Sequence, residues 1–417
     1  MLYTINRLAL LCLLLTATVA FGQSETNNLT SSPYSLFGLG SLNSSNAGKT
    51  NALGRSGIAL SGETAINNLN PAAYAGILKN SFMTDIGLKA EQNYFTNNAD
   101  ESTKKTYNFS NISVALAISE RSGIGISMLP YSDVGYYLQG VTGVIEGSDQ
   151  TFSSNIEGSG GLNNVAINYG YKLTPKLNVG LNASYYFGNI TESEYVTLDG
   201  DYLSVSEVNH YGGVRFGVGF QYMPNTKFTF AGVVTLPATL GGTQDREVYK
   251  IVNLLESDVE DVNRTIPNFK LPAEFTVGIK YTFADVLTLN ADYKHSFWNA
   301  TDMEDNIGAF TDQDLIGVGL EYYRIKSRPT YLERMKYRLG TNMDNGYLEV
   351  NGTRIKNLAL TSGLALPLSQ RGNSFLNISY SYGQRGQISN TLVKEKYHLI
   401  TVNLSLDDIW FVKRKFE

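Results

Sequence analysis

Apolar and polar side chains alternate with a period of two along most of this chain. Between Lys176 and Phe187 the odd-numbered positions are apolar or aromatic, and the even-numbered positions up to Ser184 are polar or glycine. The runs 275–283 and 287–294 repeat the pattern. Such alternation predicts β-strands with one apolar and one polar face. An apolar face opposite a polar, even charged, face is what lipid outside and a wet lumen inside require. A soluble two-layer sandwich could alternate too, but it does not explain the aromatic residues that recur at the strand ends.

Turn signals divide the chain into fourteen runs of this kind. They lie near 81–92, 106–119, 122–138, 162–172, 176–188, 207–223, 226–238, 270–283, 286–298, 312–324, 333–342, 353–366, 374–384 and 395–410. An even number of antiparallel strands lets a barrel close with both ends of the chain on one side. The predicted fold is therefore all-β, a 14-stranded antiparallel transmembrane β-barrel.

The connections between these runs alternate in length. Tight turns lie near 120–123, 173–176, 223–226 and 283–286, and long loops are expected at 139–161, 189–206, 239–269 and 299–311. Short periplasmic turns and long external loops are the rule for outer-membrane barrels. The first two long loops are acidic and lack Lys and Arg, whereas the short-turn side carries Arg324, Lys326, Arg328 and Arg334. We interpret this charge pattern as a solvated surface, with ion bridges to lipopolysaccharide as the alternative.

The first 22 residues have the pattern of a secretory signal peptide. Arg7 precedes an apolar core from Leu8 to Val19, and small residues before Gln23 favour cleavage near Gly22. The core is too short to cross a bilayer as a helix, which needs about 20 residues. Cys12 lies inside this core and belongs to the predicted leader. The sequence thus predicts export through the Sec pathway to a bacterial outer membrane.

Residues 23–80 differ from the rest of the chain because they are rich in Ser, Asn, Gly and Ala and lack sustained alternation. A barrel of fourteen strands is wide enough to need filling. We therefore predict a plug at 23–80 inside a barrel formed by 81–417. A periplasmic tail without fixed structure is the alternative.

Composition narrows the function further. The chain contains 40 glycines, 27 tyrosines and only ten prolines, which suits many strands with aromatic girdles. Its net charge of −5 argues against nucleic acid as a partner. The three histidines, His210, His295 and His398, lie on separate predicted strands without metal-ligand spacing. No cofactor, metal site or catalytic group is predicted, and the chain is expected not to be an enzyme.

Several stretches resemble the FadL-type outer-membrane transporters of long-chain fatty acids and hydrocarbons. The resemblance depends on Ala65–Ala73 with its Asn-Pro-Ala, on Tyr169–Leu181, and on Leu271–Gly278 followed by Asp292, Tyr293 and Trp298. The stretches Ser32–Gly40 and Trp410–Lys415 resemble the Bacteroidota branch in particular. The resemblance covers nearly the whole mature chain. It implies fourteen strands, an N-terminal plug, and passage of apolar substrates through a lateral opening in the wall.

The resemblance also points to two candidate sites. Pro130 lies within the third predicted strand, where it removes a ladder hydrogen bond and forces a bulge or kink. A kink in the third strand forms the lateral gate of FadL-type transporters, so Met128, Leu129, Pro130 and Tyr131 are the candidate gate; a sealed bulge is the alternative. Asn70, Pro71 and Ala72 are a candidate plug latch, with a simple turn cap as the alternative.

Two functions follow. The first is passive uptake of small hydrophobic molecules through the wall opening, with membrane lipid, lipopolysaccharide and an apolar ligand as partners. The second is a non-transporting barrel subunit of a secretion or outer-membrane assembly complex, like the PorV-like relatives of the family. The acidic loops and the basic tail Lys413–Lys415 would then be docking surfaces.

Overall fold

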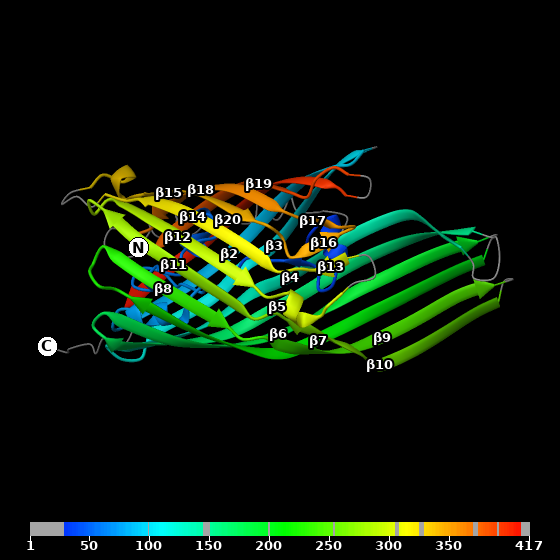
Figure 1. Cartoon of the computed structure of the whole chain (residues 1–417), viewed down its shortest axis with the longest axis horizontal. Coiled ribbons are helices and arrows are strands. Elements are labelled where there is room, and N and C mark those ends of the chain that lie inside the picture. Colours follow the sequence, from blue (N-terminus) through cyan, green and yellow to red (C-terminus); the bar gives the residue numbers. More distant parts are fainter. Residues whose placement is uncertain are drawn as a thin grey trace, which may run out of the picture.

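The structure, a computed structural model, describes residues 29–98, 100–144, 151–198, 201–252, 255–304, 308–324, 329–369, 374–389 and 392–409 (Figure 1). The predicted signal peptide and the basic tail lie outside these ranges. The elements are η1 (Pro33–Leu36), β1 (Ser41–Leu42), η2 (Gly48–Ala52), η3 (Pro71–Gly76), β2 (Ser81–Thr96), β3 (Glu101–Ala117), β4 (Ser122–Val144), β5 (Thr151–Thr174), β6 (Leu177–Leu198), β7 (Asp201–Tyr222), β8 (Phe228–Thr235), β9 (Ala238–Val252), β10 (Leu255–Leu271), β11 (Glu274–Phe283), β12 (Leu287–Ser296), η4 (Asn299–Thr301), β13 (Gly308–Phe310), β14 (Gln313–Tyr322), η5 (Leu332–Arg334), β15 (Lys336–Asp344), β16 (Leu348–Val350), β17 (Thr353–Arg354), β18 (Asn357–Pro367), β19 (Phe375–Arg385) and β20 (Lys394–Ile409).

These strands form a closed antiparallel barrel of 14 strands, which confirms the predicted fold class. Neighbours in the chain pair with each other, and β2 pairs with β20 from Ser81↔Ile409 to Thr96↔Lys394 to close the ring. Two wall strands are interrupted: β8 continues into β9, and β10 continues into β11. The chain therefore begins and ends the barrel at the end that carries the tight turns.

Three long connections that we expected to be external loops are strands over most of their length. The segments 139–161, 189–206 and 239–269 extend β4 to β7 and form most of β9 and β10, so the wall continues well beyond the predicted strand ends (Figure 1). Their prediction as loops was wrong for a physical reason. A sheet that is wet on both faces needs no apolar side chains, so it leaves no period-two signal in the sequence.

The two interruptions of the wall lie next to each other at Pro237 and Pro272. Each proline lacks an N–H for the ladder, and the carbonyl groups beside the breaks need other donors. Arg215 of β7 supplies them: its Nε donates to the Leu236 carbonyl at 3.0 Å, and its Nη2 donates to the Pro272 carbonyl. One buried guanidinium thus closes both breaks from the lumen side.

The outer face of the barrel carries an apolar band. Large apolar side chains on consecutive strands point outward and stay exposed, as the lipid-facing side of a transmembrane barrel requires. They include Ile86, Leu88, Ile112, Ile126, Ile167, Leu181, Phe216, Val218, Ile279, Ile316, Leu339, Leu358, Leu360, Ile400 and Val402. In the described ranges, no helix has the length and hydropathy for a membrane span.

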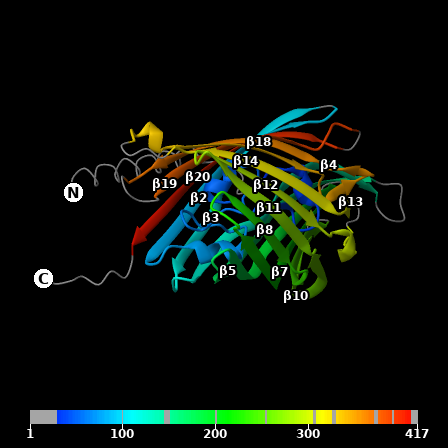
Figure 2. The same ribbon diagram turned by 60° about the vertical axis from the view of Figure 1, so that its left-hand side comes forward.

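Residues 30–80 lie inside the barrel as a plug, shown in blue in Figure 2. Inward-facing glycines of the wall make room for its backbone. A Cβ added to Gly180 would lie 2.3 Å from the Ala72 amide nitrogen, and one added to Gly340 would lie 2.3 Å from the Gly54 nitrogen. Because real Cβ atoms essentially never make contacts so short, only glycine fits at these positions, which we call the plug seats.

Gly219 and Gly217 provide a matched test of these seats, because both face inward on β7. A Cβ at Gly219 would meet Asn70 Oδ1 at 2.3 Å and Pro71 Cδ at 3.0 Å, whereas the nearest atom for Gly217 is 3.4 Å away. We expect Gly219→Ala to lower the free energy of unfolding by about 1–3 kcal/mol through overpacking, and Gly217→Ala to change it little. Urea unfolding of the refolded barrel in lipid vesicles, followed by tryptophan fluorescence, measures both. An equal change in the free energy of unfolding for both variants would contradict the contact between Gly219 and the plug.

Candidate functional site in the barrel wall

The pairing between β3 and β4 stops halfway along the strands. Only six residue pairs join them, from Ala117↔Gly123 to Ile112↔Met128. β4 keeps its pairing with β5 over nearly its whole length, and β3 keeps its pairing with β2. Beyond Met128 the two strands therefore separate, and the wall has a seam, which we call the β3–β4 seam.

A bulge in β4 lies where the seam begins. Pro130 pairs with Asn163 of β5 and Ser132 pairs with Leu162, so Tyr131 is an extra residue without a partner. An extra residue switches which side chains face inward. Up to the bulge, Leu129 and Tyr131 line the lumen. After it, Val134 and Tyr136 belong to a buried apolar cluster in the lumen. The Tyr131 ring meets Tyr186 edge to face at 4.7 Å.

The plug replaces β3 as the partner of β4. In β1, Ser41 and Leu42 pair antiparallel with Asp133 and Ser132. The Asn43 amide donates to the Tyr131 carbonyl at 2.8 Å, and the amide of Gly135 donates to Ser35 Oγ at 3.1 Å. Between Tyr131 and Gly135 the free edge of β4 is thus hydrogen-bonded by the plug, as backbone groups at membrane depth require.

Asp133 ties the edges of the seam together. Its carboxylate accepts from Lys89 Nζ of β2 at 2.9 Å and from Asn108 Nδ2 of β3 at 3.0 Å. Lys89 also donates to Asn43 Oδ1 of the plug at 2.7 Å. Asp133 is buried, and the Lys89 side chain is mostly buried. One carboxylate therefore connects β2, β3, β4 and the plug through side chains instead of a backbone ladder.

An opening lies between the separated strands on the outer side of this tie. Its volume is about 890 Å³, and it is lined by β3 from Glu101 to Tyr107 and by β4 from Gly135 to Leu138. The remaining lining residues are Phe95, Asn97, Asp100, Glu157 of β5, Val393 and the plug residues Thr30, Ser31 and Pro33. The lining combines aromatic side chains with Lys104 and Lys105. We call this feature the wall opening.

The outer half of the lumen is filled by side chains. A buried apolar cluster joins Leu39 of the plug to residues of β4, β5, β6, β9 and β10 and to the loop after β12. Trp298 and Phe310 stack in it, with ring centroids 5.4 Å apart, and Tyr347 stacks on Trp298 at the same distance. We call this group the outer apolar cluster.

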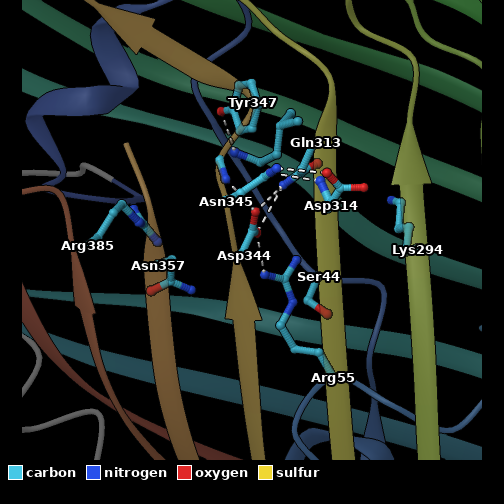
Figure 3. A network of polar contacts seen from close by, with 12 residues as sticks. Ser44, Arg55, Lys294, Gln313, Asp314, Asp344, Asn345, Tyr347, Asn357 and Arg385 are labelled. Carbon is cyan, nitrogen blue, oxygen red and sulfur yellow. Dashed lines mark hydrogen bonds and ion pairs between the residues drawn. The ribbon is translucent and has the colours of Figure 1, made fainter. Parts of the chain in front are cut away.

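The inner lumen is polar. A cavity of about 250 Å³ lies between the plug and the wall, lined by charged and amide side chains such as Arg55, Lys294, Asp344, Asn357 and Arg385 (Figure 3). Arg55 pairs with Asp344 at 3.1 Å, and Gln313 donates to both oxygens of that carboxylate. A second cavity of about 150 Å³ reaches Ser110 and Pro130 at the seam. Polar cavity space thus extends to the inner side of Pro130.

The plug also buries a cation. Lys49 of η2 is almost fully buried, and burial lowers its pKa to about 8, although the nearby carboxylate of Glu321 raises it. At neutral pH the ammonium group therefore stays mostly protonated and attracts Glu321 across the plug–wall contact.

The predicted site residues fall in two places. Met128, Leu129, Pro130 and Tyr131 stand at the start of the seam. Asn70, Pro71 and Ala72 lie buried where η3 meets the wall: Asn70 caps η3 by accepting from the Ala72 amide at 2.9 Å, and it donates to the Phe220 carbonyl of β7 at 3.1 Å. Asn70 thus makes both a turn-cap bond and a bond to the wall, and its role as a plug latch stays a prediction.

Sequence reasoning missed the most connected residues of the seam. Asp133, Lys89 and Asn108 lie on three strands, and their contact depends on register, which a single sequence does not encode. The acidic residue Asp133 within a predicted transmembrane strand was the available signal. The histidines do not gather: in the described ranges, no three His, Cys, Asp or Glu side chains are grouped as metal ligands would be.

The model of one protein family, BamG, matches residues 4–417 of this chain. The chain belongs to the BamG family. No curated protein matches the sequence.

Solved structures share the fold of this BamG family member. The toluene transporter TodX of Pseudomonas putida superposes with a TM-score of 0.59 at 12% identity, covering 89% of this chain and 100% of that one. The toluene transporter TbuX of Ralstonia pickettii gives 0.57 at 17%, covering 86% and 97%. A FadL homologue of Pseudomonas aeruginosa gives 0.53 at 12%, covering 88% and 96%. These similarities show the plugged outer-membrane barrel fold that the sequence predicted.

Removing the tie at Asp133 should loosen the seam. Asp133→Ala leaves the mostly buried Lys89 without its carboxylate, and breaking a buried ion pair typically costs about 3–5 kcal/mol. We expect a lower melting temperature and faster cleavage of β3 by protease. The control is Lys79→Ala, which removes an ion pair to Glu120 that is exposed on both sides and should change neither value. A melting temperature unchanged by Asp133→Ala would contradict the tie.

Proposed function

We propose that this BamG family member is an outer-membrane barrel that passes small hydrophobic molecules passively through the wall opening. The single observation that carries the proposal is the β3–β4 seam, where a closed barrel leaves a volume of about 890 Å³ between two adjacent strands. In this proposal the chain is exported through the Sec pathway, its leader is cleaved near Gly22, and residues 23–80 act as the plug.

The lining of the opening supports an apolar ligand. Phe95, Tyr107, Tyr136, Tyr137 and Leu138 face it, and aromatic side chains offer large apolar contact areas. Tyr107 and Tyr137 are also exposed on the outer side, so a ligand in the opening would touch the bilayer or its outer interface. Structural neighbours with the same fold include toluene transporters and a monoaromatic hydrocarbon channel.

Each gate residue has a proposed role. Pro130 and the bulge at Tyr131 turn β4 away from β3, which keeps the opening from closing as an ordinary ladder. Met128 marks the last residue pair, and Leu129 faces the lumen beside the inner cavity. In this proposal Asn70, Pro71 and Ala72 hold the plug on β5, β6 and β7, so that the opening has a fixed floor. No step requires a catalytic group.

A second candidate function is favoured by the filled lumen. The outer apolar cluster packs side chains into the outer half of the lumen, and ion pairs such as Arg55–Asp344 line the inner cavity. A barrel that transports nothing through its lumen suits a subunit of a secretion or outer-membrane assembly complex. Its strands above the apolar band would then serve as docking surfaces.

Pro130→Ala tests the gate. Restoring an N–H and relaxing the backbone should let β4 approach β3, and we expect uptake of a radiolabelled monoaromatic hydrocarbon to fall several-fold. Pro224→Ala, in a tight turn at the opposite end of the wall, is the control and should leave uptake unchanged. Uptake that is insensitive to Pro130→Ala would remove this residue from the mechanism.

Purification in mild detergent distinguishes the two candidate functions. A barrel that elutes alone, with an apolar molecule in the wall opening detected by native mass spectrometry, supports transport. Stoichiometric copurification of a large partner, with no apolar molecule bound, would exclude transport as the main role and support the second candidate.

A further inference from the structure

Beyond the apolar band, the wall becomes an open sheet of long strands, which we call the extension. It consists of the distal parts of β4, β5, β6 and β7 together with β9 and β10, which project at the right of Figure 1. β10 pairs with β9 on one side. In the described ranges, no strand pairs with the other side of β10, so this edge presents unpaired backbone groups.

This edge is unusual in length and exposure. β10 has 17 residues, and nearly all are exposed, including Leu255 at 75% and Val259 at 57%. Natural edge strands are usually short or broken by prolines and bulges. β10 has such breaks only near the barrel, where the register shifts after Asp261 and Pro267 follows. From Leu255 to Asp261 it pairs with β9 in continuous register.

The side chains along this run alternate in character. Glu256, Asp258 and Glu260 share one face of the sheet, because alternate residues of a strand point the same way. On the other face, Val259 stands beside Val248 of β9, which stands beside Val205 of β7. This apolar row crosses three strands and stops at the free edge. An added strand would continue it.

We propose that the free edge of β10 binds an extended, basic segment of a partner protein as an additional β-strand. Backbone hydrogen bonds would give affinity, as in other cases where a peptide adds a strand to a sheet. Alternate Lys or Arg side chains would face Glu256, Asp258 and Glu260, and the residues between them would be apolar and extend the row that ends at Val259. The proposal is independent of what passes through the wall opening.

Charge selects the partner. A second copy of this chain would place Glu256, Asp258, Glu260 and Asp261 against the same acidic set, and like charges on neighbouring strands destabilise a sheet. Glu247 of β9 pairs with Glu260 and adds a carboxylate to the same face, whereas the basic Lys250 and Arg246 of β9 pair with Ser257 and Asp261 on the other face. A basic partner relieves this repulsion instead of adding to it.

A peptide of alternating lysine and valine, nine residues long, serves as the probe for the purified full-length barrel in detergent. We expect hydrogen exchange at the amides of Leu255–Asp261 to slow at least tenfold when it binds. The triple variant E256Q/D258N/E260Q should weaken binding at least tenfold. The matched control E101Q/D302N/E304Q removes three exposed acidic charges elsewhere on the outer surface and should bind the peptide normally.

A second peptide separates strand addition from simple charge attraction. In this second peptide, the backbone nitrogen of every other residue is methylated. The change keeps every charge but removes the N–H groups of one peptide edge, so it should abolish both peptide binding and the slowing of hydrogen exchange in β10. Equal binding by the N-methylated peptide, or unchanged exchange at Leu255–Asp261, would overturn the proposal. So would concentration-dependent protection of β10 in the free protein, because the edge would then belong to a second copy.

Discussion

The backbone of a strand at membrane depth must find all its hydrogen-bond partners within the protein, and β4 meets this demand in an unusual way. Past Met128 its neighbour β3 no longer pairs with it. The plug takes that place, with Ser41 and Leu42 paired to Asp133 and Ser132. At the start of the opening, between Tyr131 and Gly135, the backbone of β4 therefore keeps hydrogen-bond partners, because the short strand β1 beside it comes from inside the barrel.

The position of the plug follows from the small side chains that receive it. Gly40 lies so close to β4 that an added Cβ would come within 2.7 Å of the Asp133 carbonyl oxygen, and its φ of 95° favours glycine. The inward glycines at 180 and 340 hold the plug against the opposite parts of the wall. Because the plug is fixed on several strands, its short strand β1 stays in register with β4. The side-chain tie at Asp133 then holds β2 and β3 near the same point.

Much of this architecture could be predicted from the sequence, and the features that could not be predicted have physical reasons. Alternation such as that of 275–283 predicted the transmembrane strands, because lipid and lumen impose opposite polarity on the two faces. Pro130 indicated a break in the third strand because proline cannot donate to a ladder. The extension was not predicted, since strands exposed to water on both faces need no pattern. The tie of Lys89, Asn108 and Asp133 was not predicted either, because it depends on the register of three strands and on the plug.

The most direct test of the central claim asks which segment pairs with the distal part of β4. The predicted mature chain contains no cysteine, so two engineered pairs suffice. Leu42→Cys with Ser132→Cys joins register partners of the plug and β4, and should form a disulfide readily under mild oxidation. Thr106→Cys with Val134→Cys would be opposite each other if β3 and β4 stayed paired in the register of Ile112↔Met128, and should not form one. We expect cross-linking of the first pair alone. Efficient cross-linking of the second pair without the first would show that β3, and not the plug, pairs with the distal part of β4.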